Sequence, residues 1–291
     1  MAGFLFVPHH RRSEAVDLVR DTLTWLTSNG HNAYVLEDDA RACGLTEWAV
    51  ATPEDLKIDL AVSVGGDGTM LRTLDLMCRW GLPVLGVNVG HLGYLTEVEP
   101  QDVRGAIDGF LAGKHRVEER MMVEVDASSE SRAEGGAVTL TLAHRFAVND
   151  VVVEKVASGH TARLEAIISG RPFLSYAVDA MIVATPTGST AYNFSARGPV
   201  LSPTLSALLM TPVSAHMLFD RPMVLDGNEE LELKVIGRED AAVVVDGLHV
   251  ATLGPGGSVV CRRAKNPARI VTFAERDFRE ILKVKFGLAN R

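Results

Sequence analysis

The sequence predicts an α/β domain with a mainly parallel sheet, followed by a domain built from antiparallel strands. Over the first third of the chain, strand and helix patterns alternate, which is the order of βαβ units. After residue 113, strand-like runs follow one another with few helices between them, which is typical of antiparallel sheets. A length of 291 residues is sufficient for two domains with substantial cores.

The first domain is expected to span residues 1–116. Apolar positions recur every three or four residues between Val16 and Leu26, which predicts a helix. Ser13 can cap this helix, and the pair Asn29-Gly30 can end it. The expected strands are 4–7, 33–36, 56–64 and 83–87, and further helical patterns follow residue 69 and cover 101–113.

The second domain is expected to span residues 117–274. Ser169-Gly170-Arg171-Pro172 has the composition of a hairpin turn, and Asp246-Gly247 is a second hairpin signal. A short helix is expected near residues 189–195, and the polar stretch 128–136 is expected to be a mobile loop. The expected strands are 117–126, 138–142, 147–154, 162–169, 173–177, 231–236, 241–246, 249–253, 258–263 and 270–273. The segment 275–291 has a helical pattern and is expected to dock back on the first domain.

Composition and charge exclude several classes of protein. A net charge of −8 argues against a general nucleic-acid binder, which needs a basic face. No apolar run approaches the length that spans a bilayer, and residues 1–8 fit a first strand better than a signal peptide. The cysteines (Cys43, Cys78 and Cys261) are too far apart for a metal cluster or a disulfide framework, so we expect no protein-held metal and a reducing, cytoplasmic setting.

The most informative segment is the loop Gly65-Gly66-Asp67-Gly68-Thr69, between an apolar strand and a helical pattern. Glycine allows positive φ and close approach of a ligand to the main chain, and a helix N-terminus favours an anion such as phosphate. A carboxylate at such a site could orient a cation or take a proton from a hydroxyl that is being phosphorylated. The alternative is a tight turn in which Asp67 caps the helix. The loop lacks the lysine of a P-loop and the GxGxxG spacing of a dinucleotide site.

A second segment, Thr185 to Tyr192, is rich in hydroxyl groups and follows an apolar strand. Pro186 and Gly188 shape the turn, and Ser189 or Thr190 can cap the helix that follows. Hydroxyls and main-chain amides at a helix start suit phosphate or ribose, and Tyr192 could stack on a planar ring. The alternative, a capped helix without a ligand, accounts for two of these residues.

Together these segments resemble the NAD kinase family, and the match extends over nearly the whole chain. The GGDGT loop is similar in lipid kinases and some phosphofructokinases, whereas the TPTGSTAY run is far more specific. The residues that carry the resemblance are Gly65–Thr69, Gly86–Leu95, Ala147–Asp150, Thr185–Tyr192 and Val245–Gly247.

The resemblance implies transfer of the terminal phosphate of ATP, or of polyphosphate, to the 2′-hydroxyl of the adenosine ribose of NAD, giving NADP. It also implies a Rossmann-like α/β domain that carries the glycine loop and a β-sandwich-like domain that binds NAD and forms oligomers. Magnesium would arrive with the nucleotide. The implied partners are NAD and ATP, with neighbouring subunits of a homodimer or homotetramer completing the dinucleotide site.

The resemblance assigns roles to individual residues. Asp67 is the general base or the carboxylate that orients the hydroxyl, and Asn149 with Asp150 holds the substrate ribose. Gly65, Gly66, Gly68 and Thr69 form the phosphate-donor loop. The NAD-binding residues are Asp67, Gly68, Arg72, Tyr94, Asn149, Asp150, His160, Asp179, Thr190, Ala191, Tyr192 and Ser195.

Several of these residues have a simpler explanation when taken alone. Asn149-Asp150 could be a turn pair, Arg72 a salt-bridged side chain, and His160 a hairpin residue. The run from His9 to Arg12 follows the first strand and could meet nucleotide phosphates.

The chain departs from the family pattern at Ala180, Arg197 and Leu248. An added Cβ at residue 180 would clash if φ there were positive, and Arg197 brings a bulky cation that could contact phosphate. Two other functions remain open from the residues: a lipid-kinase-like phosphotransferase that shares the glycine loop, and a non-catalytic NAD-binding regulator, against which the retained Asp67 argues.

Overall fold

The computed structural model describes residues 1–54, 56–90, 93–133, 136–274 and 277–287. Its contacts divide the chain into two compact units. Unit 1 comprises Met1–Glu119 with Ala268–Arg291, and unit 2 comprises Arg120–Pro267. Among the described helices, none is both long enough and apolar enough to cross a membrane.

Unit 1 is built on a seven-stranded sheet with the order β3-β2-β1-β4-β5-β19-β6. The strands are β1 (Gly3–Pro8), β2 (Asn32–Leu36), β3 (Ala49–Val50), β4 (Leu60–Gly65), β5 (Pro83–Asn88), β6 (Arg116–Arg120) and β19 (Ala268–Thr272). The pairs from β3 through to β19 are parallel. Every residue of β1 and β4 is buried, as expected for strands covered on both faces. The prediction of a parallel α/β domain is therefore confirmed.

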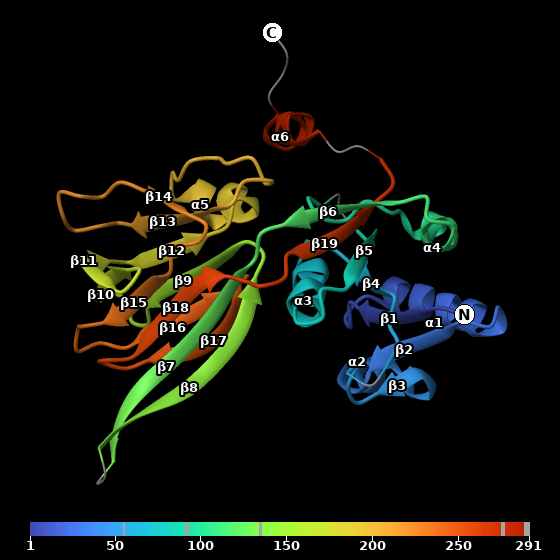
Figure 1. Ribbon diagram of the computed structural model, residues 1–291, viewed down its shortest axis with the longest axis horizontal. Helices are drawn as coiled ribbons and strands as arrows, with labels where there is room; N and C mark the ends of the chain where they lie inside the picture. The colour runs from blue at the N-terminus through green and yellow to red at the C-terminus, as the bar shows by residue number, and fades with distance from the viewer. Residues whose placement is uncertain (55, 91–92, 134–135, 275–276, 288–291) are drawn as a thin grey trace. The chain divides into compact units, whose positions relative to one another are not determined.

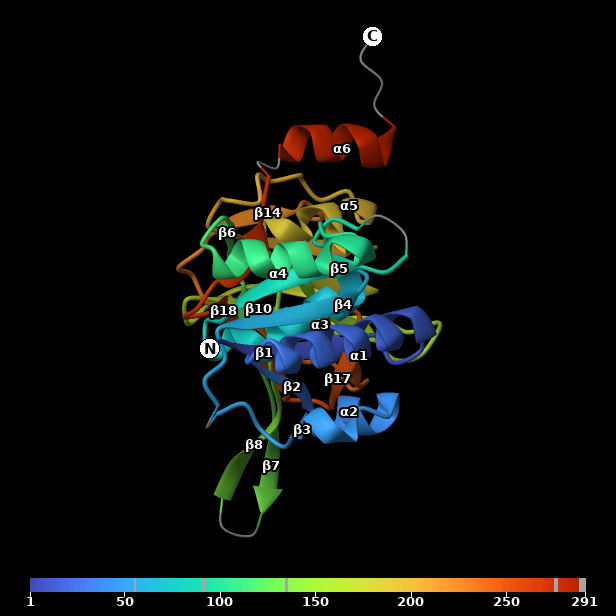
Figure 2. The same cartoon turned by 90° about the vertical axis from the view of Figure 1, so that its right-hand side faces the viewer.

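Helices cover both faces of this sheet. Figure 2 shows α1 and α4 in front of the strands and α3 behind them. Val19, Leu23 and Leu26 of α1 are fully buried against Phe4 and Phe6, which follows from their spacing of three or four residues. The helical elements of this unit are α1 (Ser13–Ser28), α2 (Glu37–Cys43), η1 (Thr46–Trp48), α3 (Asp67–Cys78), η2 (Pro100–Asp102), α4 (Val103–Leu111) and α6 (Phe278–Phe286).

The start of α1 differs in detail from the sequence expectation. Ser13 is the first residue of α1 and not its cap; Arg12 holds the cap position and makes no side-chain cap hydrogen bond. At α6, the carboxylate of Asp277 accepts the main-chain N–H of Arg279. The docking of this last helix on the first domain stays a prediction.

Unit 2 is a sandwich of two six-stranded sheets, with the orders β11-β10-β15-β18-β7-β8 and β14-β13-β12-β9-β16-β17. All of their pairings are antiparallel. The first sheet contains β7 (Val123–Ala133), β8 (Gly136–Ala147), β10 (Ala162–Ile168), β11 (Arg171–Val178), β15 (Leu231–Val235) and β18 (Ser258–Arg263). The second contains β9 (Asp150–Lys155), β12 (Ala180–Ala184), β13 (Ala207–Val213), β14 (Met223–Asp226), β16 (Ala241–Val245) and β17 (Leu248–Leu253). This confirms the expected antiparallel, sandwich-like domain.

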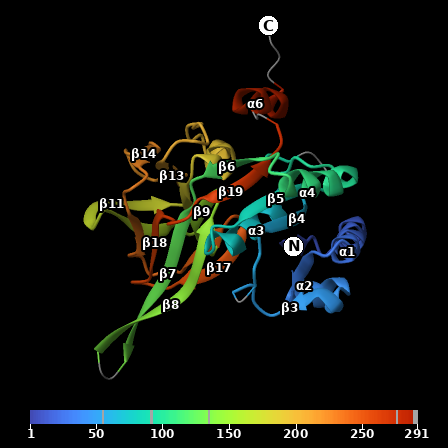
Figure 3. The same cartoon turned by 45° about the vertical axis from the view of Figure 1, so that its right-hand side comes forward.

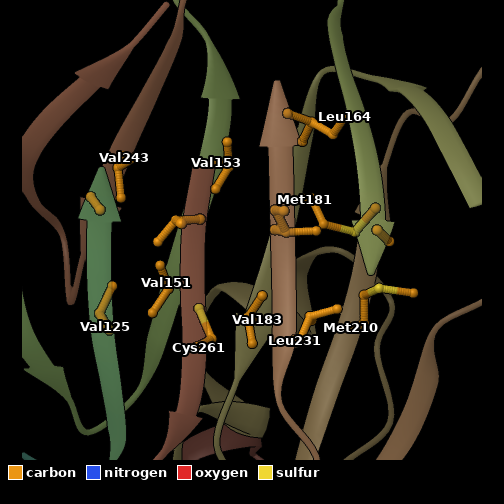
Figure 4. Close-up of a cluster of buried hydrophobic side chains, with 14 of the residues drawn as sticks. Val125, Val151, Val153, Leu164, Met181, Val183, Met210, Leu231, Val243 and Cys261 are labelled. Carbon is orange, nitrogen blue, oxygen red and sulfur yellow. The ribbon is translucent and has the colours of Figure 1, made fainter. Parts of the chain in front are cut away.

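The core of unit 2 lies between its two sheets. Alternate residues of β15 and β16 are buried, which is the period-two pattern of strands with one face inward. Figure 4 shows side chains of both sheets in this core, including Leu164 and Cys261 from the first and Val153, Met181 and Val243 from the second.

The chain crosses between the two units at places that differ from the expected boundaries. The predicted strand 117–126 is two strands, with β6 in the sheet of unit 1 and β7 in unit 2. The last strand of the expected second domain, β19, pairs in parallel with β5 and so belongs to the sheet of unit 1. Local pattern cannot indicate this, because the edge at which a strand pairs is decided by contacts distant in sequence.

Other differences lie within the units. Over the residues that the structure describes, the expected loop 128–136 is wrong: β7 continues to Ala133 and β8 begins at Gly136, forming a long hairpin that projects from unit 2 (Figures 1 and 3). Residues 134 and 135 of the expected loop lie outside the described residues. The expected short helix is a 3-10 turn, η3 (Thr187–Thr190), followed by α5 (Tyr192–Ser195). Strands β13 and β14 and helix α2 were not predicted, because a buried run containing Pro212, a four-residue strand and a polar helix of about two turns carry weak periodic signals.

Candidate functional site

The glycine loop joins β4 to α3 at the carboxyl edge of the parallel sheet. Gly65 is the last residue of β4, Gly66 precedes the helix, and Asp67 is its first residue. A Cβ at Gly65 would lie 2.3 Å from the hydroxyl of Thr69, whereas a Cβ at Gly66 or Gly68 would meet nothing within 4 Å. The three glycines have no positive φ, so the loop does not use the left-handed backbone that glycine allows. The glycine at position 65 allows close packing against Thr69, and those at 66 and 68 leave open the space that a side chain would occupy.

The main chain holds Asp67 at both carboxylate oxygens. The N–H of Tyr94 donates to Oδ2 at 2.7 Å, and the N–H of Leu95 donates to Oδ1 at 3.0 Å. A Cβ at Gly93 would lie 2.0 Å from Oδ1, so a glycine is required beside the carboxylate. Because Asp67 lies inside the helix and bonds to a different loop, the alternative role as a helix cap is wrong.

Tyr94 therefore lies next to Asp67, as its assignment to the same site requires. Burial, followed by the Asp67 charge, raises the pKa of the Tyr94 phenol. The preceding His91 and Leu92, which carry part of the family resemblance, lie outside the described residues.

A basic cavity of about 630 Å³ adjoins the loop within unit 1. It is lined by Pro8, His9, His10, Arg11, Arg12, Gly66, Asp67, Gly68, Thr69, Arg72 and Gly93. Among the described residues that line it, three arginines and two histidines surround a single carboxylate, which suits a ligand with several negative charges. Residues 9–12, which follow β1, meet the glycine loop at this cavity, although Arg12 and Gly66 are 54 positions apart in the sequence.

Arg72 is both salt-bridged and exposed to this cavity. Its guanidinium pairs with the carboxylate of Asp39 through two N–H groups, at 2.8 and 3.1 Å. His10 Nε2 bonds to the same carboxylate. Asp39 was not predicted as a site residue, because it belongs to the unpredicted helix α2 and meets Arg72 only through the fold.

A second cavity, of about 330 Å³, lies in unit 2. It is lined by Asn149, Asp150, Val152, Glu154, Ala191, Tyr192, Val244, Asp246 and Gly247. Four of the predicted NAD-binding residues therefore meet in one place: Asn149, Asp150, Ala191 and Tyr192. Glu154 was not predicted to belong to it.

Asp246 organises the wall of this second cavity. Its carboxylate accepts the main-chain N–H groups of Val148, Asn149 and Asp150, at 2.8, 2.8 and 3.0 Å. The pair Asp246-Gly247, with φ of 47° and 81°, makes the two-residue turn between β16 and β17 that its sequence predicts. The sequence explanation as a hairpin is correct but incomplete, because the side chain of the turn also fixes a segment 96 to 98 residues away.

Asp150 has an unusual titration. Burial, and then the neighbouring Asp246 charge, raise the pKa of its carboxyl to about 7, against a smaller lowering by the main-chain N–H of Tyr192. A carboxyl of an unfolded chain loses its proton near pH 4, so the folded state holds this proton over a range in which the unfolded state does not. The contribution of this carboxyl to the free energy of unfolding is therefore fully present below about pH 4 and is lost as the pH rises through 7.

We accordingly expect Asp150→Asn to stabilise the ligand-free protein more at pH 8 than at pH 5, by about 2 kcal/mol. Urea unfolding of both proteins at the two pH values measures this difference. An equal effect of the substitution at pH 5 and pH 8 would contradict the raised pKa.

The hydroxyl-rich segment serves mainly to fix its own turn. Thr185 Oγ1 donates to the carbonyl of Val148 and accepts the N–H of Gly188 at 3.0 Å, and fully buried Ser189 donates to Pro186 O at 2.6 Å. A Cβ at Gly188 would lie 1.9 Å from the carbonyl oxygen of Asn149. The expected capping by Ser189 or Thr190 is wrong, since Ala191 holds the cap position of α5. These contacts press the segment against the Asn149-Asp150 pair.

Asp179, Thr190 and Ser195 were also predicted to bind NAD, but they are not among the described residues that line the second cavity. Asp179 accepts from Lys155 Nζ at 2.5 Å, which lowers the pKa of its carboxyl. Burial first, and then Glu154, Asp150 and Asp179, raise the pKa of the Tyr192 phenol, so Asp179 lies near the second cavity. Thr190 donates to Thr187 O at 3.3 Å, and Ser195 is exposed at the end of α5.

His160 lies apart from that group. It lines another cavity of about 580 Å³ with Arg163 and Arg238, and its Nδ1 is 3.4 Å from Glu239 Oε1. The structure thus does not bring His160 into the cavity that contains Asn149 and Tyr192.

The departures from the family pattern have different structural consequences. Ala180 lies in β12 without a positive φ, so the clash considered above does not arise. Arg197 has φ 62°, a left-handed conformation that glycine adopts with less strain. Leu248 is the exposed first residue of β17.

One group in unit 2 has the composition of a metal site. The ligand atoms of Glu124, Asp126 and His144 lie within 4.8 Å of one another. Arg262 donates to both carboxylates, at 3.0 and 2.5 Å, and so already balances their charge. Cys43, Cys78 and Cys261 are buried free thiols.

Comparison with known proteins identifies the family. Residues 4–115 match the ATP-NAD kinase N-terminal domain, and residues 148–273 match the ATP-NAD kinase C-terminal domain. The NAD kinase of Heliobacterium modesticaldum is 43% identical over 230 residues, which are 79% of this chain and 78% of that protein.

Solved structures share the fold. Yeast NADH kinase complexed with NADH has a TM-score of 0.85 and 22% identity, covering 100% of this chain and 89% of that one. The NAD kinase from Archaeoglobus fulgidus in complex with ATP has a TM-score of 0.69 and 22% identity, covering 99% of each chain. With both of its domains matched, and with a relative of 43% identity over most of its length, this chain belongs to the NAD kinase family.

Proposed function

We infer that this protein is an NAD kinase, which transfers the terminal phosphate of ATP to NAD and gives NADP. The observation that carries the assignment is Asp67, a carboxylate held by two main-chain N–H groups at the wall of a cavity that is otherwise basic. Such a cavity suits the phosphates of a nucleotide, and the carboxylate of Asp67 suits an acceptor hydroxyl.

The proposed acceptor is the 2′-hydroxyl of the adenosine ribose. In the transfer, the bond from the 2′-oxygen to the terminal phosphorus forms and the bond from that phosphorus to the bridging oxygen of ADP breaks. Asp67 orients the hydroxyl and takes its proton. Gly65, Gly66, Gly68 and Thr69 form the wall at the reacting phosphate, where a side chain at Gly66 or Gly68 would occupy space that is open to the ligand.

Magnesium would enter with the phosphate donor. Asp67 is the one carboxylate in the part of the cavity lining that the structure describes, and its oxygens already accept main-chain hydrogen bonds. The donor set therefore fits an ion held mainly by phosphate oxygens and water, and the ion would neutralise charge on the phosphates.

NAD binding is assigned to the second cavity and its surroundings. Asn149 and Asp150 offer an amide and a carboxyl to a vicinal diol, as the ribose of NAD presents. Tyr192 and Ala191 line the same cavity, and Asp179, Thr190 and Ser195 are assigned to the rest of the dinucleotide. Arg72, Tyr94 and Gly68 of unit 1 are also assigned to NAD, and Arg72 and Gly68 line the basic cavity. His160 is assigned to NAD as well, although it lines a different cavity from Asn149.

Two further properties complete the proposal. We expect a homodimer or homotetramer, whose state sedimentation velocity measures directly. Buried free thiols suit the reducing cytoplasm, which is the proposed location.

A donor panel tests the function. Purified protein is incubated with NAD and magnesium together with ATP, other nucleoside triphosphates or polyphosphate, and NADP is measured with an NADP-specific dehydrogenase. We expect NADP with ATP; the panel decides whether polyphosphate also serves, and NADH in place of NAD tests acceptor preference. Absence of NADP with every donor, under conditions in which NAD binds, would instead favour a non-catalytic NAD-binding protein.

A further inference from the structure

Asp39 is a buried carboxylate directly behind the basic cavity. Its side chain has 0% exposure, whereas those of its partners Arg72 and His10 are 42% and 38% exposed. Both partners line the cavity, and Asp39 is not among the lining residues. The carboxylate therefore acts on the cavity through the side chains of Arg72 and His10, which it binds.

The pairing leaves Arg72 able to bind a ligand. A guanidinium has five N–H donors in one plane, and the contact with Asp39 uses one on each terminal nitrogen. A bidentate contact fixes the orientation of that plane as well as its position. Arg72 is thereby held in one conformation before a ligand arrives, at a smaller entropic cost on binding.

Asp39 can be compared with two acidic neighbours in the same helix. Glu37, Asp38 and Asp39 occupy the first turn of α2 and favour its N-terminus alike. Glu37 and Asp38 are exposed and lie near Arg41, at 2.7 and 3.9 Å. Asp39 points inward, where an unpaired carboxylate would be costly. An acidic residue that only stabilised the helix N-terminus would not need to be buried against two residues of the cavity, as Asp39 is.

We propose that Asp39 is a positioning residue that presents Arg72 and His10 to a phosphate chain bound in this cavity. The proposal rests on the proposed function. Both substrates of that reaction contain linked phosphates, so the ligand class is a linear polyphosphate, and the experiment identifies which substrate supplies it.

The decisive measurement is the steady-state kinetics of Asp39→Asn, which keeps the size of the side chain and removes its charge. We expect KM for ATP or for NAD to rise at least about tenfold, the effect of one lost charge-assisted contact, with a smaller change in kcat. The substrate whose KM rises is the one whose phosphates Arg72 and His10 contact. Unchanged KM values for both substrates would overturn the proposal.

Asp38→Asn is the matched control, because it removes the same charge from the same helical turn at an exposed position. We expect it to leave both KM values unchanged. A tenfold rise in this variant as well would assign the effect to the helix N-terminus and overturn the specific role of Asp39.

A double substitution tests whether Asp39 acts through Arg72. In the background of Arg72→Ala, we expect Asp39→Asn to raise KM by a smaller factor than it does in the wild type, since one of the two side chains that it positions is already gone and only His10 remains. Full additivity of the two substitutions would contradict the mechanism.

Binding of inorganic tripolyphosphate gives a readout independent of turnover. We expect it to raise the Tm of the wild type and of Asp38→Asn more than that of Asp39→Asn, and equal shifts in all three would count against the proposal. If Asp39→Asn does not fold, Asp39→Glu, which moves the carboxylate by one methylene, carries the same expectations. A wild type that binds tripolyphosphate but forms no NADP would refute the proposed function and leave the role of Asp39 to be judged by binding.

Discussion

Replacing Asp67 with asparagine is expected to lower kcat for NADP formation by about 10²–10⁴-fold, while KM for NAD and for ATP changes little. The carboxylate is the group proposed to orient the 2′-hydroxyl and take its proton, and an amide cannot do the second. Initial rates over a range of both substrates separate the kcat effect from the KM effects. A variant with unchanged kcat would refute the assignment of Asp67.

The same substitution has a structural cost that must be measured beside it. An asparagine has one side-chain acceptor oxygen, so it can accept from Tyr94 or Leu95 with that oxygen but loses the paired arrangement of two carboxylate oxygens. We expect a loss of about 1 kcal/mol in the free energy of unfolding. Asp108→Asn on α4, an exposed carboxylate in the same unit, is the control and should alter neither rate nor stability.

Replacing Asp246 with alanine is expected to cost about 3–5 kcal/mol in the free energy of unfolding and to raise KM for NAD. Three main-chain N–H groups lose a charged acceptor at once, and hydrogen bonds to charged groups are among the stronger ones. The Asn149-Asp150 pair that they fix belongs to the second cavity, so binding suffers with stability. Urea unfolding and NAD titration measure the two effects.

Asp240→Ala provides the comparison for Asp246, because Asp240 is exposed and immediately precedes the same strand, β16. We expect a change within about 0.5 kcal/mol there. For Asp246→Asn we expect a loss in the free energy of unfolding between those of the two alanine variants, since an amide oxygen still accepts a hydrogen bond. If Asp246→Ala were as stable as Asp240→Ala, the carboxylate would not be fixing the 148–150 segment.

The sequence predicted those parts of the fold that local pattern determines. A buried apolar run followed by glycines and a helical pattern gave β4, the loop and α3 in the correct order, and the Asp246-Gly247 turn followed from its residue types. The second half was correctly assigned as antiparallel because its strand-like runs follow one another with few helices between them.

The site could be predicted only in part, for a different reason. Asp67, Asn149, Asp150 and Tyr192 belong to recognisable motifs, but the groups that hold them do not lie beside them in the sequence. Asp246 is 96 residues from Asp150, and Asp39 is 33 residues from Arg72. Carboxylates of this kind look like ordinary turn or helix residues until the fold brings their partners to them.

The position of β19 has a consequence for how the chain is made. A ribosome delivers β1 to β5 early, but the strand that pairs with the outer edge of β5 comes only after all of unit 2 has been synthesised. Until then the edge of β5 is an open template for unwanted pairing, and β6 has no neighbour in its sheet. The first 116 residues alone are therefore not an independent module, and a truncation after them should aggregate where the whole chain does not.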